Sequence, residues 1–251
     1  MKTKYLVKVV VCLSSLLLLV ACGGKKEDTS HSSQSKSAKK QSVSKSSSSA
    51  SSEEPVQKSQ VYADLLNVFT GESLPSNVFP PNNQQISAAY TTPHSQSYQL
   101  NYYEVSTALP LNDSSLASAT PFATFKKDEV ASSDEAIQAV GYQESGGQAL
   151  ALHHGITGYQ QGAAGSTYLG WKEGRWSLVV QVTNGTDQNA ETVANNIIDL
   201  LDTVYLPAPS DVGQITIHVG SSNTLSYNEG NIVYTLTHQD YLSLLKMAAS
   251  Q

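Results

Sequence analysis

LGWKEG, residues 169–174, returns as LSYNEG at residues 225–230, and this repeated L-x-[W/Y]-x-E-G pattern decides the fold. The glycine that ends each copy supplies the positive φ of a tight hairpin turn. A strand-like apolar run follows each turn, over residues 176–182 and 232–236. The pattern therefore predicts two β-hairpins. They are either copies of one duplicated unit or two hairpins with similar turn chemistry, and matches this short also arise by chance.

Each predicted hairpin leads into a predicted helix. Apolar residues recur at helical spacing over residues 189–201 and again over residues 239–249. Thr237 and Asp240 are a candidate capping pair for the second of these helices. Strands followed by helices in this order predict an α+β fold, in which an antiparallel sheet of hairpins is covered by helices.

The segment before the repeat contains further predicted elements. They are a helix over 59–70, strands over 85–92 and 97–105, a loop over 106–121, a helix over 133–140 and a strand-rich block over 148–182. Ser132 and Glu135 match a capping box at the start of the second helix, and Gly141 is placed to end it.

The first 22 residues differ in character from the rest of the chain. Lys2, Lys4 and Lys8 precede an apolar run from Val9 to Val20. At a rise of 1.5 Å per residue, this run spans about 18 Å as a helix, short of the ~30 Å hydrocarbon core of a bilayer. The run is therefore typical of the apolar region of a signal peptide rather than of a spanning helix.

The end of this region, Leu19-Val20-Ala21-Cys22, resembles the lipobox of bacterial lipoproteins of the Gram-positive type. The resemblance implies that a diacylglyceryl group is attached to Cys22 and that the signal peptide is cut between Ala21 and Cys22. Two acyl chains anchor a protein durably, whereas one chain binds membranes only marginally. The resemblance thus implies a lipid-anchored protein on the extracellular side of the cell membrane. An ordinary secretory signal with an incidental cysteine is the alternative.

Composition changes abruptly after the predicted cleavage site. Thirteen of the 23 residues from Ser30 to Ser52 are serine, and a segment this poor in apolar residues is expected to stay disordered. We therefore predict three parts: a signal peptide over 1–21, a Ser/Lys-rich tether over 22–58, and one extracytoplasmic α+β domain over 59–251. Because Cys12 lies in the signal peptide, Cys22 is the only cysteine of the predicted mature chain, which excludes an intramolecular disulfide.

The predicted domain is strongly acidic. Between Val61 and Gln251 it contains 17 Asp and Glu against five Lys and Arg, a formal charge of −12 with neutral histidines. Nucleic-acid binding needs clustered cations that replace phosphate counterions, so no nucleic-acid partner is expected.

The run from Trp171 through the helix near 189–204 to Tyr205-Leu206-Pro207 resembles small exported lipoprotein domains of Mog1/PsbP-like architecture, over about residues 165–250. Such domains are mostly non-catalytic accessory modules. The resemblance therefore argues against an enzyme but names no ligand. Together with the predicted anchor and tether and the lack of an active-site motif, it leads us to expect a non-catalytic binding or accessory role at the cell envelope, with an envelope protein or a small ligand as partner and no cofactor.

Two groups of side chains are candidates for a site. Trp171, Trp176 and Tyr227 are candidates for a ligand groove, although core or cross-strand packing is the ordinary role of such residues. His153 and His154 are the best candidates for metal or catalytic chemistry, as in an extracellular hydrolase or a metal-dependent enzyme that would pair one of them with a carboxylate such as Glu144. Adjacent residues on a strand point to opposite faces, so we expect that the two histidines share no ion and that the chain has no metal site and no catalytic residues.

Overall fold

The computed structural model describes residues 60–93 and 95–251, so the predicted signal peptide, lipobox and tether lie outside the described residues. Its helices are α1 (Gln60–Val68), α2 (Ser133–Val140), α3 (Ala190–Leu201) and α4 (Tyr241–Ala248), with 3-10 turns η1 (Ser114–Ser118) and η2 (His153–Gly155). Its strands are β1 (Gln85–Thr91), β2 (Tyr98–Val105), β3 (Ala123–Glu129), β4 (Gln148–Ala151), β5 (Thr157–Ala163), β6 (Ser166–Glu173), β7 (Trp176–Thr183), β8 (Gly213–His218), β9 (Asn223–Glu229) and β10 (Ile232–His238).

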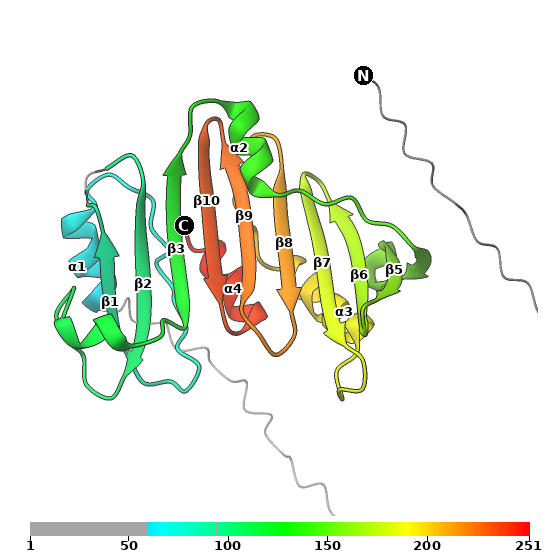
Figure 1. The fold of residues 1–251 in the computed structure, drawn as a ribbon, viewed down its shortest axis with the longest axis horizontal. Helices are drawn as coiled ribbons and strands as arrows, with labels where there is room; N and C mark the ends of the chain where they lie inside the picture. Colours follow the sequence, from blue (N-terminus) through cyan, green and yellow to red (C-terminus); the bar gives the residue numbers. More distant parts are fainter. Residues whose placement is uncertain (1–59, 94) are drawn as a thin grey trace, which may run out of the picture. The chain divides into compact units, whose positions relative to one another are not determined.

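All ten of these strands form one sheet, in the order β1-β2-β3-β10-β9-β8-β7-β6-β5-β4 (Figure 1). With four described helices on this sheet, the α+β class is confirmed. The sheet is mixed, however, because β7 and β8 pair in parallel while every other pair is antiparallel. The prediction of a purely antiparallel sheet is wrong at this one pair, where α3 carries the chain back to the starting end of β7 before β8 begins.

The repeated pattern forms two hairpins of the same geometry. Glu173 pairs with Trp176 in the first, and Glu229 pairs with Ile232 in the second, so each turn has two central residues. Gly174 and Gly230 open these turns with φ of 59° and 60°, the left-handed conformation that glycine adopts without strain. Each hairpin is followed by a helix, α3 or α4, as the sequence predicts.

The main hydrophobic core lies on one face of the sheet. Helices α1, α3 and α4 contribute Leu65, Ile197 and Leu245 to it, and these residues pack with alternate residues of the strands. Helix α2 belongs to a separate small cluster in which Ala136 and Val140 contact Val233. Since Val233 is adjacent in β10 to the core residue Tyr234, α2 lies on the opposite face.

The ends of the helices follow the predicted capping chemistry in part. The Ser132 hydroxyl accepts a hydrogen bond from the Glu135 amide at 3.2 Å, and Gly141 ends α2 in the left-handed conformation. At α4 the cap is Asp240, whose carboxylate accepts from the Ser243 amide at 2.8 Å. The prediction that Thr237 takes part in this cap is wrong, because Thr237 belongs to β10 and its hydroxyl pairs with that of Thr124 at 2.8 Å.

Candidate functional site

A row of aromatic rings crosses the core face of the sheet. Tyr98 of β2, Phe125 of β3, Tyr234 of β10, Tyr227 of β9 and Trp176 of β7 follow one another with ring centroids 6.1, 6.0, 5.0 and 5.8 Å apart. Tyr227 and Tyr234 are stacked, with 22° between the ring planes. Such pairs add about 0.5–1.5 kcal/mol beyond the burial of their area. The five rings therefore form a continuous aromatic surface on the core face of the sheet, here called the floor.

The row passes over β8 because that strand has a glycine there. A Cβ at Gly213 would lie 2.6 Å from Cζ3 and 2.7 Å from Cδ2 of the Trp176 ring. Real Cβ atoms do not approach this closely. The absence of a side chain at Gly213 thus lets the Trp176 indole lie across β8 and reach Tyr227 on β9.

Two shallow clefts open above the end of this floor. The first, here called the tyrosine cleft, has a volume of about 220 Å³ and is lined by Tyr205, Tyr227, Glu229 and Tyr234, among others. The second, the tryptophan cleft, has a volume of about 200 Å³, and Trp176 is among its lining residues. Tyr205 and Leu206 line both clefts and so form a wall between them.

Hydrogen bonds hold this wall at both ends. At the end of α3, the amides of Thr203 and Val204 both donate to the carbonyl oxygen of Leu200 at 3.0 Å. Farther along, the Arg175 guanidinium donates to the carbonyl oxygens of Pro209 and Ser210 at 2.7 and 2.6 Å. The segment 202–210 is therefore fixed to α3 and to the turn between β6 and β7.

A buried asparagine fixes the residues that follow. Asn228, which is fully buried in β9, accepts hydrogen bonds from the amides of Asp211 and Val212 and donates one to the Asp211 carboxylate. Tyr205 lies in segment 202–210, which these hydrogen bonds and those to Leu200 hold at its two ends, and 85% of its surface is exposed. A large aromatic side chain is thus presented to solvent on a supported backbone.

The tyrosine cleft is lined by neutral hydroxyl groups and by one carboxylate side chain. Burial, followed by the nearby Glu229 charge, raises the pKa of the Tyr227 and Tyr234 hydroxyls, that of Tyr234 to about 12. Both hydroxyls are therefore neutral at physiological pH. Tyr227 donates its proton to the Gln251 side-chain oxygen at 3.2 Å. The exposed Glu229 carboxylate has no hydrogen bond or ion pair within the part of the chain that the structure describes.

The structure buries all three residues predicted for a groove. Trp171 is 0% exposed in the core, where its indole N–H donates to Glu173 at 2.8 Å, so it lines no groove. Trp176 and Tyr227, 8% and 2% exposed, are core residues that also line the two clefts. Sequence reasoning missed Tyr205 and Tyr234, and it treated Glu229 only as part of the repeat.

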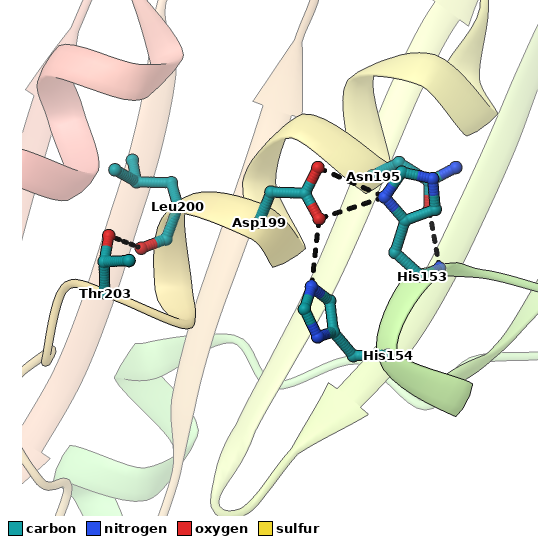
Figure 2. A network of polar contacts seen from close by, with 6 residues as sticks. All are labelled: His153, His154, Asn195, Asp199, Leu200 and Thr203. Carbon is teal, nitrogen blue, oxygen red and sulfur yellow. Dashed lines mark hydrogen bonds and ion pairs between the residues drawn. The ribbon is translucent and has the colours of Figure 1, made fainter.

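The two histidines line neither cleft and lie on the turn before β5. Figure 2 shows them beside Asp199 and Asn195. They are not on a strand as assumed: they form the 3-10 turn η2, in which His154 has a left-handed φ of 54°. Both rings therefore face one residue of α3. His153 Nδ1 lies 2.9 Å from one oxygen of Asp199, and His154 Nε2 lies 3.1 Å from the same oxygen. The Asn195 side-chain oxygen accepts a hydrogen bond from the His153 backbone amide. These contacts tie η2 to α3.

The histidine cluster consists of two imidazoles and one carboxylate. The hydrogen bond between His153 and Asp199, followed by the one between His154 and Asp199, lowers the pKa of the Asp199 carboxyl. Each of the three side chains is about half exposed. Within residues 60–93 and 95–251, no serine or threonine hydroxyl makes a hydrogen bond to either ring, and no three His, Cys, Asp or Glu side chains are arranged to hold a metal ion. Glu144, the carboxylate considered as a partner, pairs with Lys172 at 2.6 Å.

Comparisons of the chain with protein-family models, with curated proteins and with solved structures found no match. The lipobox and the Mog1/PsbP-like architecture therefore stay predictions from the sequence. Among the described helices, none combines the length and the apolar character required to cross a bilayer.

Proposed function

We propose that this chain is a lipid-anchored protein of the cell envelope whose domain is a non-catalytic binding module, with its site at the tyrosine and tryptophan clefts. The pattern that ends in Cys22 supports the anchor. One observation carries the binding role: Tyr205, 85% exposed, stands between two clefts on a backbone segment held at both ends. Exposed aromatic side chains on rigid supports give binding sites large contact area at low entropic cost.

The alternative is an extracellular hydrolase that uses His153 or His154. The contact between His153 and Asp199 favours it, because a carboxylate that orients an imidazole is part of many hydrolytic sites. A general base must also reach a nucleophile or an ordered water, and the described hydroxyl groups make no hydrogen bond to either ring. We therefore favour binding over hydrolysis.

A thermal-shift screen of the full chain in detergent tests the binding role. The ligand classes are sugars, cell-wall fragments, peptides, amines, metal ions and lipids. A ligand at about 100 times its dissociation constant stabilises the fold by roughly 2.7 kcal/mol, which gives a visible shift of the melting temperature. We expect a shift that is lost in Tyr205→Ala and kept in Tyr159→Ala, which removes another exposed tyrosine, from β5.

Two results would contradict the proposal. A shift that survives Tyr205→Ala would place the ligand elsewhere on the domain. A shift that depends on His153, together with turnover of the ligand, would favour the hydrolase.

A further inference from the structure

We propose that the tyrosine cleft binds a primary alkylammonium group, such as a lysine side chain or a small free amine. This inference rests on the proposed function, because it names the chemistry of one of its two clefts. Three properties of the cleft carry it: its size, its charge and its hydrogen-bonding capacity.

The size of the cleft suits one functional group rather than a whole ligand. Its volume of about 220 Å³ is below the range of roughly 300–1,000 Å³ that holds drug-sized molecules. An ammonium on a short methylene chain fits a space of this size. The rest of a larger ligand would lie outside the cleft, against the exposed ring of Tyr205.

The charge of the cleft favours a cation. Glu229 is the only charged side chain among the residues that line it, and this carboxylate has no ion pair within the described residues. Tyr227 and Tyr234 stay neutral because burial raises the pKa of their hydroxyls. An anionic ligand would meet one unbalanced negative charge, whereas a cation would neutralise it. The charge of −12 over residues 61–251 adds to the attraction.

The hydrogen-bonding groups of the cleft favour a primary ammonium among cations. This group has three N–H donors and no acceptor. The Tyr227 oxygen can accept, because its proton is directed to Gln251, and the Tyr234 oxygen and the Glu229 carboxylate are further acceptors. A quaternary ammonium has no N–H group and so cannot donate a hydrogen bond to these acceptors. The ring of Tyr205 adds a cation–π contact of the kind found at exposed sites.

The test is a titration of the full, ¹⁵N-labelled chain in detergent with n-butylammonium and with Nα-acetyl-lysine N-methylamide. The chain has two tryptophans, so its spectrum contains two indole N–H signals. We expect the Trp176 signal to shift, because this ring lines the neighbouring cleft and contacts Tyr227, and the Trp171 signal to stay nearly in place. Equal affinity of the two probes would indicate that the ligand is a free amine. Tighter binding of the lysine derivative would indicate that the ligand is a peptide.

Variants test the roles of single groups. Glu229→Gln should weaken binding about tenfold, and Tyr234→Phe, which keeps the stacked ring, about threefold. Asp187→Asn is the matched control, because it removes an exposed carboxylate that lies outside segment 202–210 and lines neither cleft, and it should change affinity less than about twofold.

Three outcomes would overturn the inference: no saturable binding of either amine, equal binding to Glu229→Gln, or tetramethylammonium binding as tightly as n-butylammonium. The screen described above separates this failure from that of the proposed function. If another ligand class shifts the melting temperature in a Tyr205-dependent way, the clefts are a binding site with different chemistry. If no ligand class does so, both the inference and the proposed function fail.

Discussion

Replacing Gly213 with alanine tests how the floor of the two clefts is built. Gly213 has no positive φ, so its backbone accepts an L-residue, and the loss of chain entropy in the unfolded state would favour alanine by about 0.4–1 kcal/mol. The new Cβ would, however, lie 2.6 Å from Cζ3 and 2.7 Å from Cδ2 of Trp176. Overpacking of a core typically costs about 1–3 kcal/mol. We therefore expect a net loss of about 1–2 kcal/mol in the free energy of unfolding.

The assay is urea denaturation of Gly213→Ala beside a matched glycine variant. Gly146 also lacks a positive φ, and a Cβ there would have nothing within 4 Å, so Gly146→Ala should be neutral or slightly stabilising. In a Trp176→Leu background the clash partner is absent, and Gly213→Ala should then cost much less, which a double-mutant cycle measures. If Gly213→Ala is as harmless as Gly146→Ala in the wild-type background, the Trp176 ring does not lie over β8 as described.

Three further variants test the anchor, the wall and a buried histidine. Cys22→Ala should move the protein out of the membrane fraction or leave its signal peptide uncut, and unchanged membrane association on cell fractionation would refute lipidation as the anchor. Arg175→Met removes the two hydrogen bonds to residues 209–210. It should cost about 1–3 kcal/mol in urea denaturation and speed amide exchange in segment 202–212, and unchanged exchange would contradict the pinned wall. His238 is held neutral because burial lowers the pKa of its imidazole below the ordinary 6.5. The unfolded chain therefore binds the extra proton first as the pH falls below 6.5, so stability should decrease from pH 7.5 to pH 5. In His238→Gln this decrease should be smaller, and an equal decrease would assign it to other groups.

The helices were the easiest elements to predict, because their signals are local. Ser132 and Gly141 mark the ends of α2 by their own chemistry, and the apolar period of residues 189–201 predicts α3 without reference to the rest of the fold. The hairpin glycines are local signals as well. Each of these features is decided within a few residues of chain.

Two strands were missed because their signals depend on distant partners. Strand β3 ends in Lys126-Lys127-Asp128-Glu129, which is typical of a loop; in the sheet, the Lys127 ammonium pairs with Glu72 at 2.7 Å. Strand β8 is six residues long and follows a stretch with Pro207 and Pro209. It pairs with β7 because α3 returns the chain to the starting end of β7, and the apolar residues of β8 alone do not indicate this connection.

The candidate site was predicted only in part, for the same reason. Trp176 and Tyr227 stand out as large aromatics in the repeat, but the cleft above them exists because Arg175 and Asn228 hold a loop across it. Nothing near Tyr205 in the sequence signals those contacts. The two histidines were placed on a strand because no local rule indicated that His154 would adopt a positive φ.

The order of the strands has a consequence for how the chain is made. The last hairpin, β9–β10, fits between β3 and β8, which otherwise share no neighbour. A nascent or truncated chain that ends before Asn223 would therefore leave one edge of β3 and one edge of β8 unpaired, and such edges invite pairing with other chains. The sheet becomes continuous only when hairpin β9–β10 has been synthesised, so its completion depends on contacts between segments far apart in the chain. A chain that terminates before Asn223 would thus be expected to be aggregation-prone rather than a shorter stable domain.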